Sequence, residues 1–165
     1  MKKTNIFVIR YIFWALTLCV MIMVFNLSSQ TRTESSQLSG SITESIVKII
    51  YSDYDSASEE ERISIMQTAH IFVRKAAHFT AYFLIGAFSS VAMYTYNCKQ
   101  KVKMIVPMII GMVYAVIDEW HQSFVPGRGP QFTDVILDSF GCAVGILIVF
   151  LIVRIYDKRR EKDER

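Results

Sequence analysis

Apolar residues along this chain are gathered into four long stretches, which short polar segments separate. The stretches cover about residues 6–27, 76–96, 104–122 and 134–156. A helix needs roughly 17 to 25 mostly apolar residues to cross the hydrocarbon core of a bilayer, and each stretch is long enough. The pattern predicts an all-α integral membrane protein, in which a single domain over residues 1–165 forms a four-transmembrane-helix bundle.

The first stretch has two interpretations, because Lys2 and Lys3 precede it as basic residues precede the apolar core of a secretory signal peptide. Such a core has roughly 7 to 15 residues and is followed by a small-residue cleavage motif. The stretch here is longer, and no such motif follows it. We therefore expect an uncleaved membrane helix, with the signal peptide as the alternative.

Residues 28–75, between the first two stretches, form a long polar loop. Its first part, residues 28–41, contains six serines and is typical of a flexible linker. Two Ser-x-x-Glu sequences follow, at Ser41 and Ser58, with the spacing of a capping box at a helix start. Apolar residues recur on one face after each of them. We expect two short amphipathic helices, which lie either on the membrane surface or against the protein's own spans.

Charge is distributed unequally between the two ends of the predicted spans. The chain has 18 basic and 15 acidic residues, a net charge of +3. Suppose that one side of the membrane holds the amino-terminal end, residues 97–103 and the carboxy-terminal end with its tail over 157–165. That side then carries a net charge of +8, and the opposite side carries −5. Short cytoplasmic segments are enriched in Lys and Arg. We therefore expect a multi-pass protein of the cell membrane with both termini in the cytoplasm and the loop over 28–75 outside.

Composition excludes several other classes of protein. Hydrophobic residues make up 52% of the chain, which is too apolar for an ordinary soluble domain. The basic clusters are explained as topological signals, so we expect no nucleic-acid partner. Cys19, Cys98 and Cys142 are widely spaced and lie in or beside apolar stretches, which fits neither a disulfide framework nor a zinc motif.

Polar side chains occur at the outer end of three predicted spans, where lipid makes an unpaired charge costly. The second span contributes His78 and Tyr82, the third contributes Tyr114, Asp118, Glu119, His121 and Gln122, and the fourth contributes Asp134 and Asp138. Four of the five positions on the third span share a helical face, and Glu119 points about 100° away from Asp118. Three segments thus deliver polar groups to one depth, which predicts a polar pocket open to the outer leaflet.

The fourth span also carries a G-x-x-x-G sequence at Gly141 and Gly145, on the same stripe as Asp134 and Asp138. Small residues at this spacing allow a neighbouring helix to approach closely. We expect this face to pack inward and to bring Asp138 into the bundle. The connector over residues 124–133 is short and rich in Pro and Gly, and it places Arg128 at the pocket mouth beside a helix amino terminus. An arginine in that position favours an anion or phosphate.

These residues resemble the signature of the VanZ-like family. The resemblance rests on the run Asp118-Glu-Trp-His-Gln-Ser-Phe-Val-Pro-Gly-Arg128 with its downstream acidic residues, on Arg74-Lys-Ala-Ala-His-Phe79, and on Asn26-Leu-Ser-Ser-Gln30. Members are small bacterial membrane proteins, and the founding member is associated with teicoplanin resistance. Many relatives carry H-F-x-E-Y where this chain has His78-Phe-Thr-Ala81-Tyr82. The resemblance implies a function in cell-envelope biology, including tolerance of teicoplanin-like lipoglycopeptides, but it supplies no biochemical activity.

Three kinds of chemistry fit the predicted pocket. The candidate catalytic residues are His78, Asp118, Glu119, His121 and Asp138, and the candidate substrate-binding residues are Gln122, Arg128, Asp134, Tyr82 and Tyr114. The nitrogen and oxygen donors suit zinc or manganese, so a divalent metal is one candidate cofactor. A histidine beside carboxylates could instead hydrolyse or transfer a phosphate-containing group on an envelope lipid. A hydrogen-bonded network could bind a headgroup without reacting. The expected partners are membrane lipids, a lipid-linked envelope precursor or a lipoglycopeptide.

Overall fold

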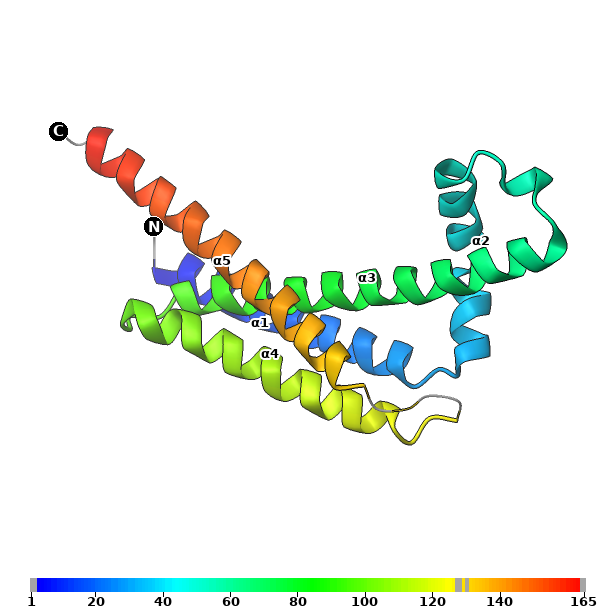
Figure 1. Ribbon diagram of the computed structural model, residues 1–165. Helices are drawn as coiled ribbons and strands as arrows, with labels where there is room; N and C mark the ends of the chain where they lie inside the picture. The colour runs from blue at the N-terminus through cyan, green and yellow to red at the C-terminus, as the bar shows by residue number, and fades with distance from the viewer. Residues whose placement is uncertain (1–2, 127–128, 130, 164–165) are drawn as a thin grey trace.

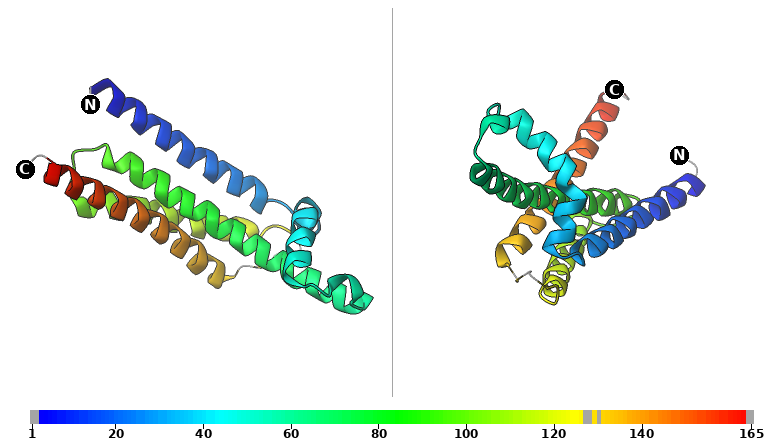
Figure 2. Two further views of the ribbon diagram at one scale, coloured as in Figure 1. Left: turned by 90° about the horizontal axis from the view of Figure 1, so that it is seen from above. Right: turned by 90° about the vertical axis from the view of Figure 1, so that its right-hand side faces the viewer.

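The computed structural model describes residues 3–126, 129 and 131–163. Five α-helices and one short 3₁₀ helix make up its regular structure: α1 (Lys3–Ser28), α2 (Arg32–Ile50), η1 (Tyr54–Ser56), α3 (Glu59–Tyr94), α4 (Gln100–Gln122) and α5 (Phe132–Asp163). Helices α1, α3, α4 and α5 pack along one another, while α2 crosses the projecting half of α3 (Figures 1 and 2). The two chain ends lie at the same end of this assembly, and α2 lies at the other (Figure 1).

The all-α prediction is confirmed for the described residues, and three helices are long and apolar enough to cross a membrane. These are residues 5–28 of α1, α3 and α5. Exposed apolar side chains cover α1 on its outer face, as expected of a helix in contact with lipid. Helix α4 is not among the three, and it carries charged residues in the turns at both of its ends. The chain is therefore a helical membrane protein, and a fourth crossing stays a prediction.

Helix α3 joins two elements that the sequence analysis separates. The predicted outer helix and the second span form one uninterrupted helix of 36 residues. At 1.5 Å per residue this helix is about 54 Å long, well beyond the roughly 30 Å of a hydrocarbon core. The Ser58 capping box is confirmed at its start: the Ser58 hydroxyl accepts from the Glu61 amide, and the Glu61 carboxylate accepts from the Ser58 amide.

The prediction of a linker over residues 28–41 is wrong, because α2 begins at Arg32. Its capping box is formed by Thr31 and Glu34, whose side chain accepts the Thr31 amide at 2.8 Å. Ser41 lies inside this helix rather than at its start, so the capping box predicted there is also wrong. Its carbonyl accepts the Ser45 hydroxyl in the next turn. Only three residues separate the end of α1 from the start of α2, and α2 then lies across α3.

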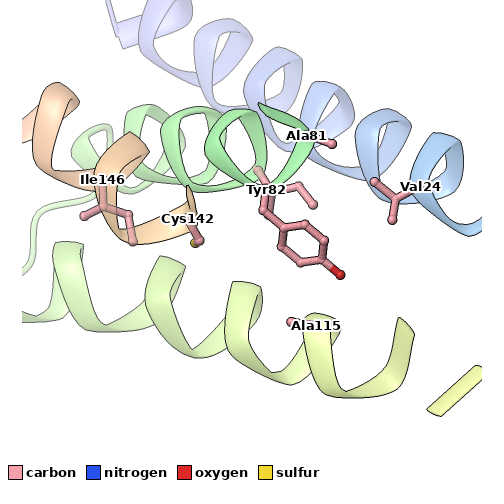
Figure 3. Close-up of a cluster of buried hydrophobic side chains, with 7 residues drawn as sticks. Val24, Ala81, Tyr82, Ala115, Cys142 and Ile146 are labelled. Atoms are coloured by element: carbon pink, nitrogen blue, oxygen red, sulfur yellow. The ribbon is translucent and has the colours of Figure 1, made fainter. Parts of the chain in front are cut away.

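Helices α3, α4 and α5 approach one another closely because glycines, which have no Cβ atom, lie where they meet. A Cβ atom at Gly145 would lie 2.1 Å from the Phe83 carbonyl oxygen, and one at Gly86 would lie 2.2 Å from the carbonyl oxygen of Cys142. The inward packing predicted for the glycine face of α5 is confirmed. The buried core beside it includes Tyr82 and Cys142, drawn in Figure 3.

At the opposite end of the bundle, Arg10 of α1 binds the end of α3. Its guanidinium donates to the Thr95 hydroxyl at 3.0 Å and to the Thr95 carbonyl at 2.9 Å. The guanidinium carbon also lies 3.8 Å from the centre of the Tyr96 ring. A cation at a helix carboxyl end is favoured by the helix dipole, so Arg10 joins α1 to α3 at the end that holds both termini.

Candidate functional site

The site forms at the end of the bundle away from the termini, where three helices bring His78, Asp118 and Asp138 together. His78 comes from α3, Asp118 from α4 and Asp138 from α5. The His78 Nδ1 atom lies 3.6 Å from Asp138 Oδ2 and 3.9 Å from Asp118 Oδ2. Both carboxylates are almost fully enclosed, with 2% of Asp118 and 4% of Asp138 exposed. The structure thus brings together three of the side chains predicted for the pocket.

Helix α1 adds a fourth wall to this cluster. The Ser28 hydroxyl donates to Asp118 Oδ2 at 3.0 Å, and Gln122 Nε2 donates to the same oxygen at 2.9 Å. Gln122 also bonds Ser28 at 3.3 Å. The two donors fix the rotamer of Asp118, because one comes from its own helix and the other from α1. Gln122 therefore orients a carboxylate, a role different from the substrate contact predicted for it.

Three buried oxygens of this region have no hydrogen-bond partner among the described residues. They are Oδ1 of Asp118, Oδ1 of Asp138 and the hydroxyl of Tyr82. The Tyr82 side chain is fully buried. Its ring extends from α3 toward α4, and the hydroxyl points away from Cys142 and Ile146 (Figure 3). Buried polar atoms are nearly always paired, so the three oxygens indicate that the cluster accommodates a further group.

Two predicted catalytic residues face other neighbours. His121 stacks on Phe25 of α1, with ring centres 4.4 Å apart, and its Nε2 lies 3.0 Å from the Ser29 hydroxyl. Glu119 accepts a hydrogen bond from the Gln131 amide in the connector before α5. Neither side chain belongs to the ion pairs of His78. The structure thus divides the five predicted catalytic residues into a cluster of three and two separate contacts.

The predicted substrate-binding residues are also distributed. Asp134 pairs with Lys75 of α3 at 2.5 Å, and Tyr114 donates to the Met21 carbonyl on α1 at 2.5 Å. Both contacts join helices at the rim or wall of the site. Arg128, which was expected at the pocket mouth, lies outside the described residues.

Sequence reasoning left Ser28, Arg74 and Lys75 out of the predicted site. Arg74 and Lys75 directly precede the second predicted span, and Ser28 directly follows the first, so the same argument from depth could have included them. Arg74 is half-buried and makes no hydrogen bond or ion pair with another described residue. Lys75, by contrast, is occupied by Asp134. Among the described residues around the site, Arg74 is therefore a cation that a ligand can reach.

Two cavities lie on the α2 side of α3, and one of them reaches the cluster at His78. The first, which we term the polar cavity, has a volume of about 400 Å³ and lies between α2 and α3. It is lined by Ser35, Ser36, Ser39, Gln67, His70, Ile71, Arg74, Lys75 and Gln131. The second, which we term the apolar cavity, has a volume of about 150 Å³. It is lined by Met23, Val24, Leu27, Gln30, Ser35, Ser39, Val73, Arg74, Ala77, His78 and Ala81.

The two cavities meet at shared residues. Ser35, Ser39 and Arg74 line both of them, and His78 lines the apolar cavity. A much smaller space between α3, α4 and α5 connects Arg74 and His78 with Asp138. Ala81 lines the apolar cavity, and none of the described residues that line this cavity is acidic. The arrangement provides a basic, hydroxyl-rich chamber beside an apolar one, and His78 of the buried cluster lines the apolar one.

A family model described as VanZ/LLP1 matches residues 13–153 of the chain. This range contains all of the cluster and both cavities, and it covers most of the sequence. The chain therefore belongs to the VanZ/LLP1 family. No curated protein and no solved structure matches the chain.

Proposed function

We propose that this member of the VanZ/LLP1 family binds the phosphate-bearing headgroup of an envelope lipid, or of a lipid-linked precursor, in the outer half of the bacterial membrane. Through this binding it contributes to tolerance of teicoplanin-like lipoglycopeptides. The observation that carries the proposal is the junction of the polar and apolar cavities at Arg74. An amphiphile has the same two parts, a charged polar head and an apolar chain.

The polar cavity has the chemistry of a phosphate site. A phosphate group accepts hydrogen bonds, and Arg74, His70 and the hydroxyls of Ser35 and Ser39 are donors in this chamber. Arginine binds phosphate through two parallel N–H···O bonds, which a lysine cannot reproduce. The apolar cavity holds Val24 and other aliphatic side chains beside the same arginine, so the start of an acyl or prenyl chain can leave water when the head binds.

The charge of the chain supports the proposed outer-leaflet location. The end that holds both termini is strongly basic and the cavity end is acidic overall. Basic ends of short-looped membrane proteins lie in the cytoplasm. Under this orientation the cavities open where lipid-linked cell-wall precursors are exposed to lipoglycopeptides.

Lipid retention by the purified protein tests the binding proposal. Phosphatidic acid presents a phosphate monoester, and diacylglycerol has the same chains without it, so the pair isolates the phosphate. We expect native mass spectrometry to show retention of phosphatidic acid and not of diacylglycerol. Arg74→Gln should weaken that retention about tenfold, because a charged hydrogen-bonding group contributes about 1.5–3 kcal/mol. Arg154→Gln is the control: Arg154 lies in the carboxy-terminal part of α5, away from both cavities, and its replacement should leave the retention of phosphatidic acid unchanged.

Susceptibility to teicoplanin tests the biological part of the proposal. At matched expression, Arg74→Gln should lose any protection that the wild-type protein gives, and Arg154→Gln should keep it. Equal retention of the two lipids by the wild-type protein would contradict phosphate recognition. Normal retention with no effect on susceptibility would leave binding intact and refute the link to lipoglycopeptides.

An enzyme that acts on the same headgroup is the second candidate, and the position of His78 favours it. His78 borders the apolar cavity while its Nδ1 atom faces two carboxylates. A histidine so placed can take a proton from water and return it to a leaving oxygen. In hydrolysis, water would add to phosphorus, the phosphorus–oxygen bond to the lipid would break, and that oxygen would take the proton. Release of inorganic phosphate from phosphatidic acid by the wild-type protein, but not by His78→Gln, distinguishes this candidate from binding alone.

A further inference from the structure

His78, Asp118 and Asp138 place three potential metal-ligand atoms close together. The separations from His78 Nδ1 to the two carboxylate oxygens are 3.6 and 3.9 Å, and all three ligand atoms lie within 4.8 Å of one another. Zinc–nitrogen and zinc–oxygen bonds are about 2.0–2.2 Å long, which places neighbouring ligands of a tetrahedral ion about 3.4 Å apart. Each of these separations must therefore shorten by at most about 1.4 Å for the three atoms to bind one ion.

The charge of the cluster favours a divalent cation. Two enclosed carboxylates close together repel each other strongly in a medium of low dielectric constant. Within the part of the chain that the structure describes, the ion-pair partner of both Asp118 and Asp138 is His78 alone. One protonated histidine balances one carboxylate, whereas a divalent ion with a neutral histidine balances both.

The unpartnered oxygens provide an independent observation. Oδ1 of Asp118 and Oδ1 of Asp138 are buried without hydrogen-bond partners, so each carboxylate has bonding capacity that the described residues do not use. The hydroxyl of Tyr82, one helical turn beyond His78, is buried and unpaired as well. A water molecule on a bound ion would give this hydroxyl a partner, since an ion with three protein ligands keeps a further position open.

The hydrogen bonds that Asp118 accepts resemble those that orient a carboxylate ligand in a metal site. Ser28 and Gln122 both donate to Asp118 Oδ2 and hold the carboxylate in one orientation. Outer hydrogen bonds of this kind orient the ligands of protein metal sites. His121 and Asp134 have the same ligand groups, but their contacts to Ser29 and Lys75 engage them elsewhere.

We propose that His78, Asp118 and Asp138 bind a divalent transition-metal ion of the zinc class, and that Tyr82 bonds a water molecule on that ion. The imidazole ligand favours zinc over magnesium and calcium, which prefer oxygen ligands alone. Zinc also binds a given site of nitrogen and oxygen ligands more tightly than manganese does. This inference goes beyond the proposed function and is independent of it, because the three ligands do not require a bound lipid.

The experiment measures metal directly on the full-length protein in detergent micelles. The protein is stripped with a chelator, reloaded with zinc, freed of unbound ion by gel filtration and analysed by inductively coupled plasma mass spectrometry. We expect the wild-type protein to retain about one zinc ion per chain. His78→Gln and Asp138→Asn should each lose the ion. The matched controls His121→Gln and Asp134→Asn should keep it.

A second measurement separates loss of metal from loss of fold. Zinc should raise the unfolding temperature of the wild-type protein and of both controls, because a ligand that binds only the folded state stabilises it. It should leave the unfolding temperature of folded Asp138→Asn unchanged, since that substitution removes a buried charge without removing volume. With cobalt in place of zinc, the wild-type protein should show the visible absorption of a tetrahedral site, and His78→Gln should not.

The result for the wild-type protein decides the proposal even if a variant fails to fold. Retention of much less than one zinc ion per chain, with no thermal shift, overturns it. Retention of the ion by both His78→Gln and Asp138→Asn also overturns it, because the metal would then bind elsewhere. Preferential retention of manganese over zinc would overturn the assignment to the zinc class. Lipid retention by Arg74→Gln is measured without added metal, so failure of one proposal is distinguishable from failure of the other.

Discussion

Replacing Gly145 by alanine should force α3 and α5 apart. The added Cβ atom would lie 2.1 Å from the Phe83 carbonyl oxygen and 2.9 Å from the Ala87 amide nitrogen. Ordinary contacts of a Cβ atom begin near 3.4 Å, so the two helices must separate by about 1.3 Å. Both neighbours are backbone atoms, which cannot rotate away as a side chain can. The substitution therefore changes the distance between the helices themselves.

The magnitude follows from two opposing effects. Overpacking a well-packed interior costs about 1–3 kcal/mol, and a backbone contact this short belongs at the upper end. Alanine is favoured over glycine inside a helix by about 1 kcal/mol, which offsets part of the cost. The net destabilisation of Gly145→Ala is then about 2 kcal/mol, or a factor of roughly 30 in the folding equilibrium.

Gly40 provides a matched control for this prediction. It also lies inside a helix, but a Cβ atom there would meet nothing within 4 Å. Gly40→Ala should keep or raise the thermal midpoint, because it gains the helix preference without the clash. Both variants are heated in detergent micelles, and the fraction that stays monodisperse is followed by gel filtration. A midpoint for Gly145→Ala equal to or above that of Gly40→Ala would refute the close contact between α3 and α5.

Three further outcomes are expected at other parts of the chain. Arg10→Ala should lower the free energy of unfolding by about 1.5–3 kcal/mol, because its charged hydrogen bonds to Thr95 are lost; chemical denaturation measures this, and Arg10→Lys should recover only part of the loss. Ser58→Ala should cost about 1 kcal/mol through loss of the cap and should speed amide hydrogen exchange in the first turn of α3; unchanged exchange there would contradict the capping role. In intact cells a membrane-impermeant thiol reagent should label Asp53→Cys and not Lys101→Cys, both introduced into a chain whose native cysteines are replaced; the reverse pattern would invert the proposed orientation.

The spans were predictable because their signal is long and strong. A run of about 20 apolar residues has few alternatives to a membrane helix, and α1 and α5 begin within three residues of the predicted starts. The continuity of α3 was also encoded, since its sequence contains no proline and no glycine before Gly86. Sequence reasoning divided it at the change from amphipathic to apolar character. Shortly after that change, from Ala81 onward, α3 carries its buried residues, and the backbone does not break there.

The linker prediction failed because serine content was given more weight than capping geometry. Thr31 and Glu34 have the spacing of a capping box, and α2 begins there despite its serines. Helix propensity differs among ordinary residues by only a few tenths of a kcal/mol each. Packing of α2 across α3, which no local pattern reveals, decides the outcome.

Helical phase explains which site residues could be assigned from sequence. Asp118 and Gln122 are four residues apart and lie about 40° from each other around α4, so both reach the cluster. His121 is three residues from Asp118 in the same direction and lies about 100° from Gln122, which turns it toward α1. The sequence alone indicates that Asp118, His121 and Gln122 are polar and lie at a similar depth. The helix that each of them faces depends on the packing angles of the bundle.

Those packing angles connect the chemistry of the site to the glycines of α5. Asp138 and Gly141 share one face of α5, and a Cβ atom at Gly141 would lie 2.6 Å from the carbonyl oxygen of Phe79, the residue after His78. The contact that allows α5 to approach α3 is therefore one turn from the 3.6 Å separation between His78 and Asp138. A larger residue at Gly141 would widen that separation and also loosen the bundle. Such a substitution therefore cannot distinguish a structural role of this region from a chemical role of Asp138. Asp138→Asn keeps the volume and the glycine contact, and any function that it removes belongs to the carboxylate itself.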